Sequence, residues 1–594
     1  MSSSLILQIT GRVSREFRSS GEVQQSGGHV LIQGSLPSMM SRRTSRVVVV
    51  VVVVVAMFVE MVIVGVVLVV LVGSVLIAVA GKVTKKLVLT EAISEDGGTG
   101  GLQSGASLAS GLRRTAAASV GRQHSRRYSV PTSHSTSEPR WRYKIDSYVR
   151  KIAAKVETGG ITVTTAITLN TARPVTPDLC QDVLMHICRK VEALRIRFRE
   201  RDGELWVADM DTPKIDFQVV EGGNVEDVAK ITSHSAYSKV EGPLWRARLV
   251  VCPPDEPCML PQVKEAFPYQ YHLVIDMHHA VFDALCNMVV SELFFQTLDS
   301  MLDGAQLDDR QIGEFRDRSE VRAAEARIRE SLQKDPRRLK ALLEERYKIM
   351  TRVPLITEAF GERKESPPDT NTLRPEILDH KLLQVFNAKC KAHKVTFNSG
   401  FLGVMNVALM ELVREAGVVR DSYVISTRHP VSTRRYMRGV TSMVWGFHSL
   451  PMSMDTVMPW DARNNFWKHV VDIDTNFRER IRKMGPVEQL VLDTMLQPMI
   501  KDRGNKTIYD MALTNTYAPT IEAIGNGKHV QISQFHGYSS VNGLEYKMLC
   551  GIFGFKNWVQ SQLAYSSEYI TKEIAAKLFE RMITVFNDTA KSLD

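Results

Sequence analysis

The stretch Tyr271–Asp283, which reads YHLVIDMHHAVFD, carries the sharpest local signal in the sequence. Its first seven residues predict a strand, and a short loop then leads into an apolar helix. Two adjacent histidines, His278 and His279, follow the strand, and Asp283 comes four residues after the second histidine. Histidine titrates near neutral pH and is a common general base in enzymes. The stretch therefore predicts catalytic chemistry at the edge of a strand.

Two other interpretations of these residues are weaker. Two histidines and a carboxylate could ligate a metal, but adjacent residues at a strand edge point to opposite faces, and the sequence has no HExxH or CxxC motif. We therefore predict no metal site. Cys286 has no base and orienting group arranged for a nucleophile, so we expect a buried structural thiol. His272 and His448 have no comparable neighbours and are expected in the core.

The positive charge of the chain is concentrated near its beginning. The 594 residues include 75 Lys and Arg against 65 Asp and Glu, a net charge of +10. Residues 1–140 hold 15 Lys and Arg against 7 Asp and Glu, so the rest of the chain is almost neutral. The basic patches in this part are not interleaved with aromatic residues, as binding to single-stranded nucleic acid would require. We therefore predict no nucleic-acid partner.

The first 140 residues differ in composition from everything after them. Few aromatic residues and no cysteine precede Trp141, whereas Ser, Gly and Arg are abundant. Such a chain buries too little apolar surface to offset the entropy of ordering its backbone. The sequence predicts a disordered basic tail over 1–46 and a disordered linker over 81–140, with the globular protein starting near Trp141.

Residues 47–80 are an almost uninterrupted apolar run that begins with nine valines and contains Glu60. The run is longer than the about 20 residues that cross a bilayer as a helix. It predicts a transmembrane helix and a single-pass membrane protein. The seven cysteines have no repeating spacing and fit reduced thiols, so we expect the catalytic part on the cytosolic side. The alternative is a low-complexity tract that spans no membrane, which would leave the protein cytoplasmic.

Beyond the linker, strand-like and helix-like segments alternate. Residues 307–350 are rich in charge and predict a solvent-exposed helical connector. A late pair of strands is expected around 530–535 and 547–553. The pattern predicts an α/β protein with two lobes, 141–370 and 371–594.

The motif His278-His279-x-x-x-Asp283 resembles the HHxxxDG motif of the CoA- and carrier-dependent acyltransferase superfamily. This superfamily includes condensation domains of nonribosomal peptide synthetases, alcohol O-acetyltransferases and chloramphenicol acetyltransferase-like folds. Gly242–Arg246 resembles its gPLwR strand, and Gly446–Pro451 resembles its G-x-x-x-x-LP segment. The resemblance covers roughly 141–594. It implies two chloramphenicol acetyltransferase-like lobes with the site in a tunnel between them.

The resemblance also implies a role for each residue of the motif. His279 would be the general base, taking a proton from a hydroxyl or amine as that group attacks an acyl thioester. His278 would be its structural partner. Asp283 would turn away and be held by an arginine, either Arg428 or Arg434.

The implied reaction needs no cofactor, because acyl-CoA, or an acyl group on a separate carrier protein, is a co-substrate. A small alcohol or amine would accept the acyl group. Thr514 and Asn515 resemble the SN strand near the tunnel, and with Gly446 they are expected to contact substrate. We expect a monomer that is anchored in a membrane.

The sequence departs from the family pattern at one position of the motif. Residue 284 is Ala where Gly is commonest. No DFGWG motif follows, which argues against the plant acyltransferase branch, and no GGxS carrier site is present. The alternative interpretation is a non-catalytic, condensation-like binding protein tethered to a membrane.

Overall fold

The computed structural model describes residues 139–592, with gaps at 162, 362–368, 374, 498–506, 517–524, 543 and 556–557. Before residue 139 it describes only the backbone of two short strands, β1 (Gln25–Ser26) and β2 (His29–Val30). The chain divides into the units Met1–Thr132 and Ser133–Asp594. Apart from these two strands, the predicted basic tail 1–46 lies outside the described residues, as do the apolar run 47–80 and almost all of the predicted linker.

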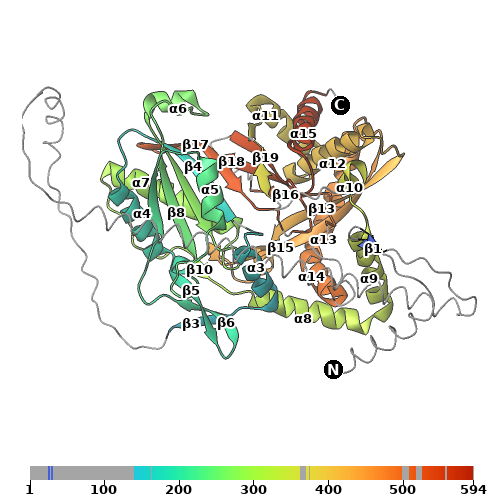
Figure 1. The fold of residues 1–594 in the computed structure, drawn as a ribbon, viewed down its shortest axis with the longest axis horizontal. Helices are drawn as coiled ribbons and strands as arrows, with labels where there is room; N and C mark the ends of the chain where they lie inside the picture. Colours follow the sequence, from blue (N-terminus) through green and yellow to red (C-terminus); the bar gives the residue numbers. More distant parts are fainter. Residues whose placement is uncertain are drawn as a thin grey trace, which may run out of the picture. The chain divides into compact units, whose positions relative to one another are not determined.

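The first large sheet has the strand order β17-β4-β9-β8-β7 (Figure 1). These strands are β17 (Val530–Tyr538), β4 (Val163–Thr171), β9 (Tyr269–Met277), β8 (Trp245–Val251) and β7 (Phe217–Glu221). One face packs on α4 (Pro177–Lys190) and α7 (Ala284–Asp303), and the other packs on α5 (Val225–His234). Because helices cover both faces, β9 is buried along nearly its whole length, including its polar residues Gln270, His272 and Asp276.

A smaller sheet has the order β3-β6-β5 and lies beside the first one. Its strands and the neighbouring short elements are β3 (Trp141–Lys144), β6 (Glu204–Asp209), β5 (Ile196–Arg201), α3 (Ser147–Glu157), η1 (Glu192–Arg195) and α6 (Pro261–Ala266). Helix α3 begins directly after β3, where the Asp146 side chain accepts a hydrogen bond from the Val149 N–H. This N-cap fixes the position of α3 next to the histidine loop described below.

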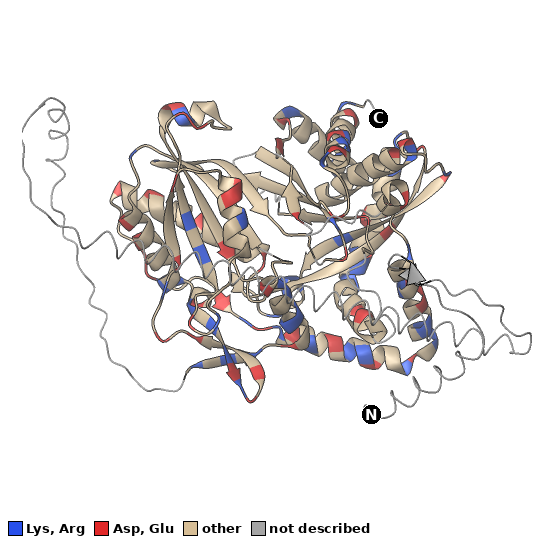
Figure 2. Ribbon diagram, viewed as in Figure 1, with Lys and Arg blue, Asp and Glu red and all other residues tan. Residues whose placement is uncertain are grey.

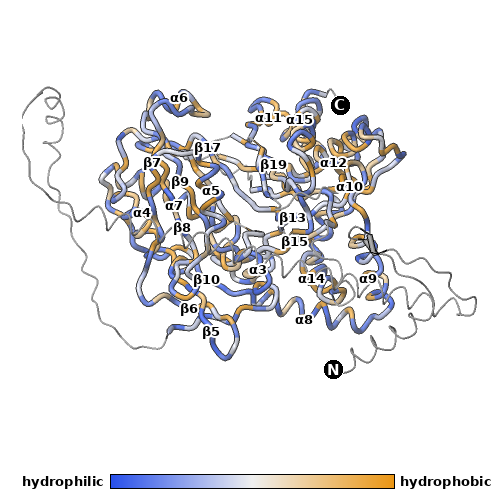
Figure 3. Tube along the Cα trace, viewed as in Figure 1, coloured by the Kyte–Doolittle hydropathy of each residue, from blue (hydrophilic) through white to orange (hydrophobic). Residues whose placement is uncertain are grey.

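The second large sheet has the order β11-β19-β18-β16-β13-β15, and β12 also pairs with β19. Its strands are β11 (Thr370–Thr372), β19 (Trp558–Ser566), β18 (Met548–Phe555), β16 (Met511–Asn515), β13 (Ser422–Ser432), β15 (Ser449–Pro459) and β12 (Glu376–Ile377). Its core is formed with α10 (Leu355–Phe360), α11 (His380–Ala392), α12 (Phe397–Glu415), α13 (Phe466–Arg482) and α15 (Lys572–Lys591). Helix α12 is rich in apolar residues and is buried along most of its length (Figure 3).

The charged connector forms two helices, α8 (Ser319–Lys334) and α9 (Pro336–Thr351), on which basic and acidic residues alternate (Figure 2). The prediction of a helical connector is confirmed, but the prediction that it is solvent-exposed is only partly right. One side of it packs on α14 (Gly485–Leu496), where Leu332 meets Val491 and Leu492. Arg346 is buried as well and forms an ion pair with Asp493.

The mixed α/β fold is confirmed, but the predicted pairing of the last strands is wrong. Strand β17 does not pair with β18; it crosses to the first sheet and pairs antiparallel with β4. Val530, Ile532 and Phe535 of β17 belong to the core of the first sheet, so burial of these side chains favours the crossover. The short strands β10 (Glu314–Phe315) and β14 (Val444–Trp445) also pair across the two lobes. The lobe boundary near residue 370 remains a prediction, so the first and the second lobe below denote only the parts built on the first and the second large sheet.

In the part of the chain that is described, no single helix has both the length and the apolar composition needed to cross a membrane. Helices α11 and α12 meet the test only as a pair, and they are bent by 108° relative to each other. Helix α12 is buried in the core of the second sheet.

Candidate active site

The histidine pair lies in the loop between β9 and α7. His278 and His279 follow the last residue of β9, and α7 begins at Ala284. Asp283 is the N-cap of α7, and its Oδ1 accepts a hydrogen bond of 3.2 Å from the Cys286 N–H. A carboxylate at this position satisfies a free backbone donor and interacts favourably with the helix dipole. The N-cap formed by Asp283 thus marks where the loop ends and α7 begins, and it fixes the position of the two histidines in that loop.

The two ring nitrogens of His279 have different environments. Nδ1 lies 2.9 Å from the Phe282 carbonyl oxygen. A carbonyl can only accept a hydrogen bond, so Nδ1 carries the proton and Nε2 keeps its lone pair when the ring is neutral. Among the described residues, none hydrogen-bonds to Nε2, and His279 lines a cavity between the two sheets. The ring therefore presents an unprotonated nitrogen where a substrate hydroxyl or amine could bind.

The surroundings keep this imidazole neutral near pH 7. Burial lowers the pKa of His279 below its ordinary value of 6.5, although the hydrogen bond to the Phe282 carbonyl and the charge of Asp283 act in the opposite direction. The ring edge also contacts Phe447, with the ring centroids 5.4 Å apart. A neutral, oriented imidazole is the form that a general base requires.

His278 does not line this cavity, and its ring is packed in the protein interior. It is fully buried between Phe198 and Tyr237, with ring centroids 5.0 and 5.1 Å away. Its Nδ1 accepts a hydrogen bond of 3.2 Å from the Ala280 N–H, which places the proton on Nε2. Burial lowers the pKa of His278 to about 3. The two adjacent histidines thus face opposite sides, as their place at a strand edge suggests.

Asp283 is held by an ion pair that crosses from the first lobe to the second. Its Oδ2 and Oδ1 accept hydrogen bonds from Arg434 Nη1 and Nη2 at 2.6 and 3.1 Å. The His448 N–H donates a further one to Oδ2 at 3.1 Å. Burial would raise the pKa of Asp283, but the charge and hydrogen bonds of Arg434 outweigh it, so the pKa lies below its usual value. The carboxylate is therefore ionised, and both of its oxygens accept hydrogen bonds in this contact.

Of the two arginines that the sequence left open as the partner of Asp283, the structure pairs Arg434. Arg434 lies in η2 (Thr433–Tyr436), just after β13. Arg428 lies within β13 and donates a hydrogen bond of 2.9 Å to the Tyr509 hydroxyl. The same hydroxyl accepts from Arg346, so Arg428 belongs to a separate buried polar cluster.

Gly446 supports the Asp283 ion pair, and its contact with substrate remains a prediction. Its carbonyl accepts hydrogen bonds from Arg434 Nη2 at 3.2 Å and from Cys286 Sγ at 3.5 Å. Its φ of 135° is a backbone conformation that glycine adopts easily and other residues rarely adopt. A Cβ at this position would also come within 2.6 Å of His448 Nε2. Gly446 is not among the described residues that line the cavity. Burial raises the pKa of the Cys286 thiol to about 12, so this cysteine is not a thiolate.

The cavity beside His279 has a volume of about 140 Å³ and is lined from both lobes. Thr164 and Thr165 of β4 form one side of it with Gly537 of β17. Thr514 of β16 also lines the cavity, and its contact with substrate remains a prediction. Asn515, the next residue, instead donates a hydrogen bond of 3.4 Å to Asn398.

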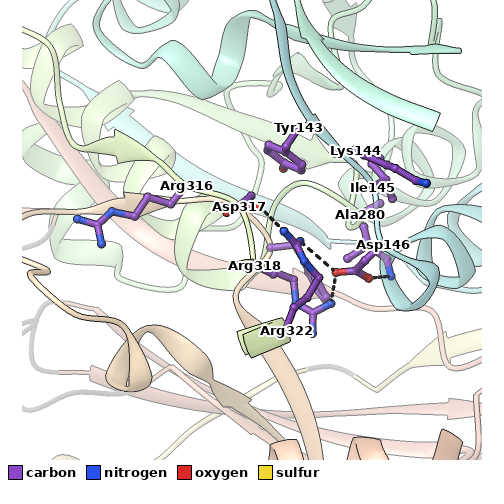
Figure 4. Close-up of a pocket in the computed structure, with 11 residues that line it drawn as sticks. Tyr143, Lys144, Ile145, Asp146, Ala280, Arg316, Asp317, Arg318 and Arg322 are labelled. Atoms are coloured by element: carbon purple, nitrogen blue, oxygen red, sulfur yellow. Dashed lines mark hydrogen bonds and ion pairs between the residues drawn. The ribbon is translucent and has the colours of Figure 1, made fainter. Parts of the chain in front are cut away.

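On another side of the histidine loop the structure is closely packed. A small pocket of about 10 Å³ beside Ala280 has room for about one water molecule. Figure 4 shows Arg318, which precedes α8, and Arg322 of α8 reaching Asp146 at the wall of this pocket, with the closest contact 2.8 Å from Arg318 Nη1. Arg318 also lies over the ring of Tyr148, which in turn stacks on Phe447. Charged and aromatic side chains from α3 and α8 thus support the ring that touches His279.

Comparison with protein-family models gives one match, the condensation domain, over residues 151–444. This match contains the histidine loop, α7 and Arg434. Residues 151–444 belong to the condensation domain family. Comparison with curated protein sequences gives no match.

Solved structures of condensation domains share the fold of this chain. The condensation domain from Monacolin K polyketide synthase MokA is 13% identical, with a TM-score of 0.52 over 75% of this chain and 97% of that one. The first condensation domain of the calcium-dependent antibiotic synthetase is 12% identical, with a TM-score of 0.55 over 76% and 96%. TRI3 trichothecene 15-O-acetyltransferase from Fusarium sporotrichioides is 8% identical, with a TM-score of 0.52 over 76% and 97%. At these identities the likeness concerns the fold alone.

Three residues beside the condensation-domain motif were not found from the sequence. Phe447 contacts His279, and its place next to Gly446 in the Gly446–Pro451 segment could have drawn attention to it. Tyr148 and Arg318 act through Phe447, and nothing local in the sequence marks them. His448 was expected only as a core residue; it is fully buried, but its backbone N–H also binds Asp283.

We predict that Arg434→Gln lowers stability by about 3–5 kcal/mol at pH 7, because it leaves the Asp283 carboxylate buried without a charge partner. In the native protein the pKa of Asp283 is lowered, so its stabilising effect is present above about pH 4 and is lost as the pH falls through the lowered pKa. In Arg434→Gln the lowering effect of Arg434 is lost, so burial raises the pKa of Asp283. The loss of stability in Arg434→Gln should therefore be smaller at pH 4 than at pH 7, as measured by urea unfolding.

The matched control for this measurement is Arg310→Gln, which removes an exposed partner of Asp308. It should leave stability almost unchanged at either pH, because solvent screens an exposed ion pair. A loss in Arg434→Gln that does not depend on pH would contradict the assigned partnership of Arg434 and Asp283.

Proposed function

We propose that this protein is an acyltransferase that moves an acyl group from a CoA or carrier-protein thioester to a small alcohol or amine. The observation that supports this most directly is the state of His279. Its Nδ1 is committed to the Phe282 carbonyl, and its Nε2 is free at a cavity lined by both lobes. Membership of residues 151–444 in the condensation domain family agrees with acyl transfer.

In the proposed reaction His279 is the general base. Nε2 removes the proton from the acceptor hydroxyl or amine while the oxygen or nitrogen attacks the thioester carbonyl carbon. The C–S bond of the resulting tetrahedral adduct then breaks, and the departing sulfur takes the proton back from Nε2. The products are an ester or amide and a free thiol, and no cofactor is consumed.

Asp283 and His278 are positioning residues in this proposal. Asp283 faces Arg434 and not the His279 ring nitrogens, so it does not orient the base directly. It fixes the loop through the N-cap of α7 and the ion pair. His278 fills the opposite side of the loop among Phe198 and Tyr237. Of these three residues, the proposal assigns proton exchange with substrate to His279 alone.

We predict that His279→Ala in the full-length protein lowers turnover by about 100- to 10,000-fold, the usual contribution of a general base. Acetyl-CoA is supplied with a panel of small alcohols and amines, and thiol release is followed. The matched control is His272→Asn, which changes a buried histidine of β9 that does not line the cavity. Equal activity of wild type and His279→Ala would show that His279 is not the base. Wild-type protein that binds acyl-CoA without turnover would favour the non-catalytic binding protein instead.

The pH dependence of the same reaction tests the environment of His279. Burial lowers its pKa, so the neutral, active form persists below pH 6.5. With an alcohol acceptor, kcat/KM should stay constant between pH 6.5 and 8 and fall on the acid side with a midpoint below 6.5. A midpoint at or above 6.5 in the wild type would contradict a buried, neutral base.

We propose further that residues 47–80 anchor the protein in a membrane as a single span with the catalytic part in the cytosol. The support is the length of the apolar run alone. After carbonate extraction of membranes, full-length protein should remain in the pellet, and a variant that lacks 47–80 should appear in the supernatant. Release of the full-length protein would exclude the anchor and leave the cytoplasmic alternative.

A further inference from the structure

The cavity beside His279 is lined by both polar and apolar side chains. Ser539 and Ser540 lie among polar residues of its lining, near Thr164. Met288, Phe535 and Phe553, which also line it, pack against or belong to the hydrophobic core of the first sheet. We call these last three residues the apolar wall. At this wall the cavity borders the hydrophobic core of the first sheet.

Phe553 is the member of the apolar wall that comes from the second sheet. It lies on β18 and contacts Phe535 of β17, with ring centroids 5.8 Å apart. Its ring fits because two neighbours lack a side chain. A Cβ at Gly537 would collide with the ring tip, and a Cβ at Gly551 would come within 2.6 Å of Cε2. Two strands from different sheets thus leave space for this one ring.

A buried amide lies next to Phe553. Gln560 of β19 is its direct cross-strand partner, so the two side chains share one face of the second sheet. Gln560 is fully buried, and neither its Nε2 nor its Oε1 has a hydrogen-bond partner among the described residues. Gln560 does not line the cavity, whereas Phe553 does. The Phe553 ring therefore stands beside a buried polar group that remains separate from the cavity.

We propose that Phe553 determines the size of the substrate group that fills the cavity, and that removal of its ring opens the cavity to Gln560. The volume of about 140 Å³ is close to that of an engineered cavity of about 150 Å³ that binds benzene. The native site therefore takes a compact, mainly apolar group of about six non-hydrogen atoms. This inference rests on the proposed function for its link to turnover. The same chemistry could belong to the acyl chain or to the acceptor, and the experiment separates the two.

The test compares Phe553→Ala with Phe555→Ala in the full-length protein. Phe555 is also buried on β18, on the same face, but it does not line the cavity. One series uses straight-chain acyl-CoAs of increasing length with one small alcohol, and the other uses acetyl-CoA with alcohols of increasing length. Phe553→Ala should raise the turnover of long relative to short substrates by about tenfold or more in one series, which identifies the group that fills the cavity. Phe555→Ala should keep the wild-type profile.

The role of Gln560 is tested in the Phe553→Ala background. Long chains that end in a hydroxyl should be preferred over chains that end in a methyl group, and Phe553→Ala/Gln560→Leu should lose that preference. Equal preference in the two variants would overturn the part of the inference that concerns Gln560.

A binding measurement keeps the size inference separate from catalysis. The shift in melting temperature caused by straight-chain alcohols requires no turnover, and Phe553→Ala should gain the larger shift from the longer alcohols. If no variant and no wild type releases thiol but this gain appears, the proposed function fails and the size inference stands. Unchanged chain-length profiles and unchanged shifts in Phe553→Ala would overturn the size inference.

Discussion

The ion pair between Asp283 and Arg434 is the constraint on which the site depends. It joins the N-terminus of α7 in the first lobe to η2 in the second, and both partners are buried. A buried carboxylate without its cation is strongly disfavoured, so the loop and η2 are held in one relative arrangement. The carbonyl of Gly446 and the backbone N–H of His448 complete the contact. The histidine loop is therefore fixed by groups that belong to the other lobe.

Because of this ion pair, the charged Asp283 and the neutral Phe282 carbonyl have different roles beside His279. Asp283 is engaged by Arg434 and has no free oxygen to bind the His279 imidazole, so the ring takes its tautomer from the Phe282 carbonyl. A carbonyl orients the ring without adding a full negative charge beside it. Burial can then lower the pKa of His279 below its ordinary value. The result is an imidazole that is neutral near pH 7, as the proposed general base requires.

The sequence predicted the features that depend on neighbouring residues and missed the contacts between residues that are far apart in the chain. The strand, the loop and the helix around His278 and His279 follow from adjacent residues, because alternation and capping act over a few positions. The partner of Asp283 stayed open between Arg428 and Arg434, since the two lie six residues apart and only tertiary packing distinguishes them. The partner of β17 was missed for the same reason: β4 lies more than 350 residues earlier in the chain. The Phe447–Tyr148–Arg318 stack has no local pattern at all.

The pairing of β17 with β4 contains an irregularity that shapes the cavity. The register shifts between Ile532 and Gln534, so Ser533 is an extra residue on β17. A shift of one residue in a strand moves all later side chains to the other face. Ile532 lies opposite Leu169 before the shift, and Phe535 and Gly537 lie opposite Ile167 and Thr165 after it. Without the extra residue, Gln534 and His536 would take their places. The bulge therefore puts the aromatic ring and the glycine that accommodates Phe553 on the side where the cavity forms.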